Sequence, residues 1–336
     1  MKFVITISFF VLGLLLITGI NCNSGSTGNN PDAAATAATS TDSVYNQPDT
    51  AKIPNDKFGD LVRYGRNLML YTAYYIGPDG INGHYLGNKM NCTNCHQEAG
   101  TKPFAFSLMR SHENYPQYRA REAKVLTMAE RVNNCVMRPH SGKPLPLDSK
   151  EMVAFLSYFR WINSQLTTED KKKKGFDNLA IDLPLVAGDP QNGQKLYNEK
   201  CLRCHGGNGE GLFKPGDSAY LYPPLWGQHG YQPGSSMHRV IKQARWLKAN
   251  MPNDSAKYFK PYLTDREAID IASFVNDDRI HTRPNPKNLD YPIISEKHVD
   301  YGIGPFADSF PALQHKFGPW PPIIDYWKSK GMKPSY

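Results

Sequence analysis

The chain has 336 residues, enough for one large hydrophobic core or two ordinary ones. Its 39 Lys and Arg residues against 31 Asp and Glu give a net charge of +8, a modest excess that favours an anionic substrate or an acidic redox partner. The basic residues are scattered, apart from a run at 171–174 that is typical of a solvated linker. We therefore exclude a nucleic-acid-binding protein.

The N-terminal residues predict export. Met1 and Lys2 precede an apolar stretch at 3–20 that has the form of a secretory signal and is short for a membrane span. Because Gly19-Ile20-Asn21-Cys22 resembles a loose lipobox, we predict a signal peptide over 1–22 and a candidate lipid anchor at Cys22, with plain cleavage as the alternative. Residues 23–55 are rich in small and polar residues and predict a flexible linker. The expected location is the periplasm.

Four of the six cysteines fall in two copies of the pattern Cys-x-x-Cys-His, at Cys92, Cys95, His96 and at Cys201, Cys204, His205. Cysteines at i and i+3 project from one helical turn, so both sulfurs can bond the vinyl groups of one haem, and the following histidine can bind its iron. A zinc site would need four ligands, and the redox Cys-x-x-Cys motif does not require that histidine. The motifs predict two covalently bound haem c groups.

The surroundings of the first motif predict a small helical domain over 56–166. Helical patterns occur at 65–68 and at 148–155, and a Gly- and Asn-rich loop over 76–90 occurs in this domain alone. A linker is expected at 167–187.

A second domain is predicted over 188–283. A capped helix at 189–197 leads directly into Cys201, and a helix at 264–275 begins with the capping box Thr264-x-x-Glu267. The expected fold is mainly α, with two tandem class I cytochrome c-like domains and long loops. Residues 284–336, rich in Pro and aromatic residues, predict an extended segment strapped across the domains, to which we assign no function.

The second axial position of each haem iron largely decides whether the site transfers electrons or does chemistry. In the second domain Met251 is favoured, because it lies in a loop shortly before the terminal helix. The competing residues are Met237 and His238, which could equally pack on a helix at 237–247, and Lys248.

The internal repeat gives the counterpart of Met251 in the first domain. Met251 lies 12 residues before Leu263, and Cys135 lies 12 residues before the matching Leu147. We therefore predict Cys135 as an axial thiolate. The alternatives are a buried free thiol at this position, or ligation by one of three residues in the same stretch: His140, Met137 and Met128.

A thiolate lowers the reduction potential of a haem and a thioether raises it, so electrons would run from the first haem to the second. This asymmetry indicates catalysis at the first haem and electron exit at the second. If Arg131 and Cys135 lie one helical turn apart, a guanidinium beside the thiolate could bind an oxyanion. The alternative is that the arginines pair with haem propionates or with Glu122 and Glu130.

The stretch 116–121, followed by Glu130-Arg131-Val132-Asn133-Asn134-Cys135, resembles the dihaem thiosulfate dehydrogenases, a family that also includes tetrathionate reductases. The resemblance implies a substrate site at a first haem with His and Cys ligands, and a second haem with His and Met ligands. Carried over by position, it makes Cys135 the axial thiolate, Arg121 and Arg131 the substrate-binding arginines, and Met251 the ligand of the second haem. The implied reaction joins two thiosulfates into tetrathionate through a candidate sulfur adduct on the cysteine, or runs in reverse.

One departure from the family concerns the residues after the cysteine. The family typically has Phe-Glu-Arg-Ser, whereas this chain has Val136-Met137-Arg138-Pro139, so a proline replaces the serine hydroxyl. The expected substrate is therefore thiosulfate or a related sulfur oxyanion, with a cytochrome or a membrane complex as redox partner. The alternative function is a non-catalytic electron-transfer subunit of a respiratory chain, and a dihaem peroxidase is the third hypothesis.

Overall fold

The computed structural model describes residues 44–214, 216–284 and 290–336. The predicted signal peptide, Cys22 and most of the predicted linker at 23–55 lie outside the described residues. The described part is mainly helical, as predicted, with two small antiparallel sheets of two strands each. None of its helices is both long and apolar enough to cross a membrane.

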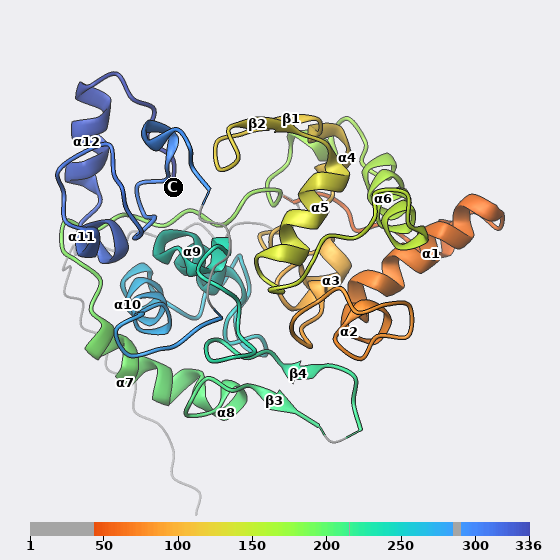
Figure 1. Ribbon diagram of the computed structural model, residues 1–336, viewed down its shortest axis with the longest axis horizontal. Helices are drawn as coiled ribbons and strands as arrows, with labels where there is room; N and C mark the ends of the chain where they lie inside the picture. Colours follow the sequence, from red (N-terminus) through yellow and green to blue (C-terminus); the bar gives the residue numbers. More distant parts are fainter. Residues whose placement is uncertain (1–43, 215, 285–289) are drawn as a thin grey trace, which may run out of the picture. The chain divides into compact units, whose positions relative to one another are not determined.

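Two crossing helices, α1 (Lys57–Leu70) and α6 (Lys150–Ser164), form the centre of what we call the first module, residues 57–164 (Figure 1). At the crossing a Cβ atom on Gly65 would lie 2.1 Å from the carbonyl oxygen of Ala154, so only glycine fits there. The α6 helix begins two residues later than the sequence pattern predicted, because the Ser149 side chain accepts a hydrogen bond from the amide of Met152. The module's other elements are α2 (Thr72–Ile76), η3 (Cys92–Asn94), α3 (Gln97–Gly100), α4 (Ser111–Asn114), β1 (Gln117–Arg119), β2 (Lys124–Leu126) and α5 (Met128–Met137).

The second module, residues 190–275, repeats this arrangement with α7 (Pro190–Lys200) and α10 (Asp265–Val275) (Figure 1). A Cβ atom on Gly193 would lie 1.9 Å from the carbonyl oxygen of Asp270. The predicted capping box at Thr264 is confirmed, and α7 ends at Cys201 as expected. The other elements of this module are α8 (Leu202–His205), β3 (Leu212–Phe213), β4 (Tyr220–Tyr222), η5 (Ser236–His238) and α9 (Val240–Asn250).

The helix expected at 237–247 is shifted along the chain. Ser235 caps the short η5 turn, and Arg239 is extended, so α9 begins only at Val240. The helix ends at Asn250, and Met251 is the extended C-cap residue that follows it.

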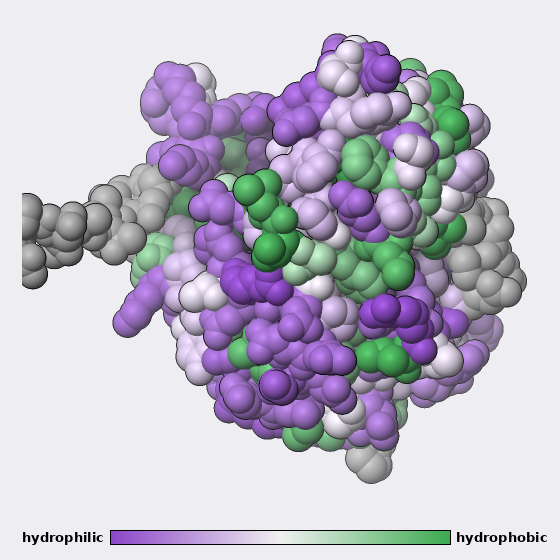
Figure 2. Space-filling view, turned by 90° about the vertical axis from the view of Figure 1, so that its left-hand side faces the viewer, coloured by the Kyte–Doolittle hydropathy of each residue, from purple (hydrophilic) through white to green (hydrophobic). Residues whose placement is uncertain are grey.

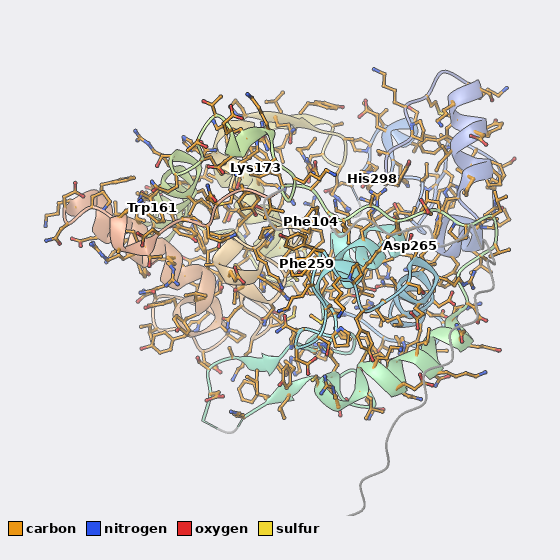
Figure 3. The ribbon with its side chains drawn as sticks, turned by 180° about the vertical axis from the view of Figure 1, so that it is seen from behind. Phe104, Trp161, Lys173, Phe259, Asp265 and His298 are labelled. Atoms are coloured by element: carbon orange, nitrogen blue, oxygen red, sulfur yellow. The ribbon has the colours of Figure 1, made fainter. Side chains whose placement is uncertain are left out.

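The two modules contact each other through α9. The indole Nε1 of Trp246 donates to the carbonyl oxygen of Cys95 at 3.1 Å, and Asn250 Nδ2 donates to the carbonyl oxygen of Phe104 at 3.0 Å. Phe104 is labelled in Figure 3. Because Trp246 is 4% exposed and Asn250 is fully buried, these bonds are shielded from water.

The C-terminal segment is not wholly extended, contrary to the prediction. It contains η6 (Ile294–Glu296), α11 (Ala312–Phe317) and α12 (Pro321–Ser329), and η4 (Asp170–Lys172) lies in the linker between the modules. Pro321 and Pro322 occupy the first turn of α12, where a missing N–H costs nothing, and Ile323 and Trp327 bury one face in the core of the second module. On the side viewed in Figure 2, hydrophobic residues lie among hydrophilic ones.

Candidate functional site

The first module contains a largely apolar cavity between α1, α5 and α6. The α5 helix begins with a capping box in which Thr127 and Glu130 bond each other's backbone amides. This start places Arg131 and Cys135 one turn apart on the same helix, as predicted, and both side chains line the cavity. The complete lining is Met69, Thr72, Ile76, Cys92, His96, Leu108, Met128, Arg131, Val132, Cys135, Val136, His140, Phe155 and Phe159.

The first Cys-x-x-Cys-His motif presents its histidine to this cavity in a fixed orientation. His96 Nδ1 lies 2.6 Å from the carbonyl oxygen of Phe106, so Nδ1 carries the proton and Nε2 is left to bind a metal. The thiol of Cys92 lies in the cavity wall. Cys95 is not part of that wall and packs against the core of the second module.

Cys135 and His96 both line this cavity. Burial raises the pKa of the thiol, but the charge of Arg131, a hydrogen bond from His96 and the charge of Arg138 outweigh it and bring the pKa to about 6. The thiolate in turn raises the pKa of Arg131. The surroundings of the thiol thus favour its thiolate form.

The two predicted substrate arginines occupy different places. Arg131 lines the cavity with Cys135, whereas Arg121 lies between β1 and β2, outside the lining of that cavity. Arg121 instead borders a neighbouring hollow together with Glu122, Asp290, Tyr291 and Pro292.

Arg138 is a site residue that the sequence analysis did not single out. It is 7% exposed, lies 2.6 Å from Glu122 Oε1, and pairs with Asp290 of the C-terminal segment. Its Nε and Nη1 atoms are buried and have no hydrogen-bond partner among the described residues. Its spacing of three residues from Cys135 was the available signal, because positions i and i+3 share a helix face.

Ser141 lies two residues after Pro139, the proline that stands where the family typically has a serine. Its hydroxyl is buried and has no hydrogen-bond partner in the described part of the chain.

The competing residues in the first module have other surroundings. His140 also lines the cavity, but its Nδ1 lies 3.1 Å from Asn88 Oδ1, and burial together with the charge of His96 lowers its pKa to about 4. Met128 contributes to the lining, and Met137 does not. Of these candidates, Cys135 is the one that shares both the cavity wall and a helix face with Arg131.

The second motif repeats the orientation of its histidine. His205 Nδ1 lies 2.9 Å from the carbonyl oxygen of Pro223, and burial lowers the pKa of the imidazole, which favours the neutral form that binds metals. Cys201 and Met251 both pack against the apolar core of this module. Among the competing residues, His238 Nε2 lies 2.8 Å from Asp278 Oδ1, Lys248 pairs with Asp265, and Met237 is a buried core residue.

Both sites fit a haem better than a metal ion held by protein ligands alone. Among the described residues no cluster of three or more His, Cys, Asp or Glu side chains could hold a metal ion, and none of the described cysteines forms a disulfide. Each site instead pairs an oriented histidine and nearby thiols with apolar walls, which is what a covalently attached porphyrin requires.

Comparison with known proteins agrees with this arrangement. The family model described as "SoxA/TsdA, cytochrome c domain" matches residues 86–165, and the model described as "Cytochrome c" matches residues 190–277. The two matches cover the first and second motifs and imply two covalently bound haem c groups.

Whole proteins match across both modules. The chain is 36% identical over 248 residues to the thiosulfate dehydrogenase of Thiomonas intermedia, covering 73% of this chain and 74% of that one. It is 34% identical over 242 residues to the thiosulfate dehydrogenase of Psychrobacter arcticus, covering 72% and 70%. The solved structure of thiosulfate dehydrogenase TsdBA from Marichromatium purpuratum, in its as-isolated form, matches with a TM-score of 0.63 at 30% identity, over 70% of this chain and 49% of that chain. The chain therefore belongs to the thiosulfate dehydrogenase family of c-type cytochromes.

Proposed function

We propose that this protein oxidises thiosulfate to tetrathionate at the cavity of the first module. Two thiosulfate anions each give up one electron, and a sulfur–sulfur bond forms between their terminal sulfur atoms. The observation that carries the proposal is the placement of Arg131 and Cys135 one turn apart on α5, in the wall of a cavity that His96 also lines. Family membership supports the same chemistry.

The residues of the first module divide the task between them. Cys92 and Cys95 would attach the haem, and His96 and Cys135 would bind its iron. The haem iron, when bound, accepts electrons one at a time. Arg131 holds a thiosulfate oxyanion beside Cys135, because a guanidinium offers forked hydrogen bonds to sulfonate-type oxygens.

The second module provides the electron exit. Cys201 and Cys204 would attach its haem, and His205 and Met251 would bind its iron. A thioether ligand raises a haem potential and a thiolate lowers it, so these ligand sets would favour electron transfer from the first site to the second. Electrons leave from there to a cytochrome or a membrane complex.

The proposal extends to location and domain limits. We assign the haem domains to 56–166 and 188–283, separated by a linker at 167–187, and place the protein in the periplasm. The sequence of residues 1–22 supports export, and Cys22 is the residue that would carry a lipid. Mass spectrometry of the mature N-terminus distinguishes a lipidated Cys22 from plain cleavage.

The test is an assay of the purified dihaem protein with thiosulfate and ferricyanide, and then with tetrathionate and a reduced dye. Reduction of ferricyanide with a stoichiometry of one electron per thiosulfate, and tetrathionate as product, is the expected result. Inactivity in both directions would refute the assignment of substrate.

A further inference from the structure

The Gly- and Asn-rich loop over 76–90, which the sequence of the second module lacks, packs against the chain that follows α5. The amide of Gly87 donates to the carbonyl oxygen of His140 at 2.8 Å. The two backbones are close, because a Cβ atom on Gly87 would lie 2.4 Å from the carbonyl oxygen of Ser141. The loop therefore fixes the backbone at His140.

Asn88 of the same loop sets the tautomer of the His140 ring. Its Nδ2 donates to the carbonyl oxygen of Pro139 at 3.0 Å, and its Oδ1 accepts from the amide of Met90 at 3.3 Å. These bonds place Oδ1, which can only accept, 3.1 Å from Nδ1 of His140. In the neutral ring Nδ1 therefore carries the proton, and Nε2 keeps its lone pair.

The His140 ring is held in this state away from water. His140 is 5% exposed and Asn88 is 1% exposed, and burial lowers the pKa of the imidazole to about 4, so the ring is neutral at pH 7. Its bond to Asn88 is the one hydrogen bond that the ring makes among the described residues. Because Nε2 has no proton to donate, His140 does not replace the missing serine hydroxyl of the family, but it can bind a metal.

His140 shares a cavity with both proposed ligands of the first haem. The cavity is lined by His140 together with His96 and Cys135. The charge of His96 helps to lower the pKa of His140, which shows that the two rings are near each other. His140 lies beyond the last residue of α5, so it reaches the cavity on a different support from Cys135. The cavity thus contains a second imidazole in addition to the thiolate.

We propose that His140 is a reserve axial ligand of the first haem, whose Nε2 binds the iron when the sulfur of Cys135 is engaged by substrate. An iron–sulfur bond breaks and an iron–nitrogen bond forms. The sulfur leaves with its electron pair and the nitrogen supplies its own, so the exchange itself transfers no redox electron and no proton. The inference rests on the proposed function, since it takes Cys135 as the resting ligand and thiosulfate as the substrate.

The exchange has a consequence for the direction of electron flow. A thiolate ligand lowers the potential of a haem, so its replacement by a neutral nitrogen raises that potential. The first haem then accepts electrons more readily while the sulfur of Cys135 is occupied. The loop over 76–90 serves this step by holding His140 in the tautomer that can bind iron.

The experiment compares the oxidised dihaem forms of the parent protein, Cys135→Ala and Cys135→Ala/His140→Leu. Removal of the sulfur stands in for its engagement by substrate. Electron paramagnetic resonance reports the spin state of the first haem, and near-infrared magnetic circular dichroism reports its ligand atoms. Two double variants are controls: Cys135→Ala/Met128→Leu changes another candidate ligand in the cavity wall, and Cys135→Ala/His112→Leu changes an exposed histidine of α4.

In Cys135→Ala the first haem should remain low-spin, with two nitrogen ligands and a midpoint potential above that of the parent protein. It should become high-spin in Cys135→Ala/His140→Leu and remain low-spin in both controls. His140→Phe fills the space of the ring without a nitrogen. In the Cys135→Ala background it should act as His140→Leu does, and it replaces that variant should the leucine protein not fold.

Samples frozen during thiosulfate oxidation with ferricyanide test the link to substrate. The parent protein should show the spectrum of two nitrogen ligands during turnover and the thiolate spectrum at rest. His140→Leu should keep the thiolate spectrum at rest and lack the spectrum of two nitrogen ligands during turnover.

A high-spin first haem in Cys135→Ala would overturn the inference and leave the proposed function intact. Two nitrogen ligands in Cys135→Ala that never appear in the parent protein during turnover would also overturn it, because His140 would then reach the iron without serving the reaction. A resting parent protein with two nitrogen ligands and no thiolate signal would refute both proposals together. If Cys135→Ala is low-spin through His140 but the parent protein does not oxidise thiosulfate, the reserve ligand stands and the proposed substrate fails.

Discussion

In both haem modules two helices cross over a glycine, and in both the motif histidine donates its Nδ1 proton to a backbone carbonyl oxygen. The modules differ at the residue that the internal repeat aligns. Cys135 lies inside α5, with Arg131 one turn before it, whereas Met251 follows the end of α9 and the residue one turn before it is Leu247. The comparison teaches that one scaffold can differ locally in charge: the side chain one helical turn before the aligned residue is an arginine in the first module and a leucine in the second.

The largest expected effect distinguishes the two proposed ligands, Cys135 and Met251. Cys135→Ala removes the sulfur proposed to bind iron, so thiosulfate oxidation should fall on the order of 10³-fold or more. The low-spin thiolate signal in the electron paramagnetic resonance spectrum of the oxidised protein should disappear with it. Met251→Ala is the matched variant, and it should slow electron exit while leaving that thiolate signal in place. A Cys135→Ala protein that keeps both its thiolate signal and its turnover would favour the alternative function, a non-catalytic electron-transfer subunit.

The next prediction tests the glycine at the helix crossing, a feature that both modules share. A methyl group at Gly65 or Gly193 would meet a carbonyl oxygen at 2.1 Å or 1.9 Å, so Gly65→Ala and Gly193→Ala should each force the crossing helices apart. We expect a loss of about 2–4 kcal/mol in the free energy of unfolding in either module. Denaturant unfolding followed by circular dichroism measures it. Gly207→Ala is the control, because no heavy atom lies within 4 Å of its added Cβ. A large loss at one glycine alone would refute the equivalence of the two crossings.

Local signals in the sequence predicted much of this framework. The caps of α7 and α10 lie within three residues of the groups they bond, and the spacing of Arg131 and Cys135 is set by a single helical turn. These are interactions between near neighbours in the chain, so their pattern is visible without a structure.

The contacts that complete the site could not be predicted in the same way. Arg138 and Asp290 are 152 residues apart in sequence, and Trp246 and Cys95 are 151 apart. No periodicity links such pairs, because their approach depends on how whole modules pack. The helices of the C-terminal segment were missed for another reason: its prolines indicate extended chain in general, but at the first turn of α12 they favour a helix.

A smaller effect concerns the junction between the modules. Trp246→Phe removes the hydrogen bond to the carbonyl oxygen of Cys95 and part of a buried ring, which should cost about 1–2 kcal/mol of the free energy of unfolding. Trp161→Phe is the matched control (Figure 3), because Trp161 is also buried, at 4% exposed, but lies within the first module. In calorimetry, Trp246→Phe should separate the unfolding of the two modules into distinct transitions and Trp161→Phe should not. Equal behaviour of the two variants would show that the indole bond does not couple the modules.

The last effect lies in the linker after α6 and depends on pH. Asp170 is buried and accepts hydrogen bonds from Thr167 and from the amide of Asn46, which ties residues near the N-terminal end of the described chain to the linker after α6.

Burial raises the pKa of Asp170, but these bonds and Lys173 outweigh it and bring the pKa to about 2, below the ordinary value of 3.8. Since the folded-state pKa is the lower one, the carboxylate stabilises the fold at neutral pH, and this contribution is lost as the pH falls through about 4 towards 2. Asp170→Asn should therefore cost about 1–2 kcal/mol at pH 7 and clearly less at pH 3. Glu169→Gln changes the adjacent carboxylate, whose ion pair with Lys172 is exposed, and should have almost no effect at either pH. A cost for Asp170→Asn that does not change between pH 7 and pH 3 would mean that the side chain acts by its shape and not by its charge.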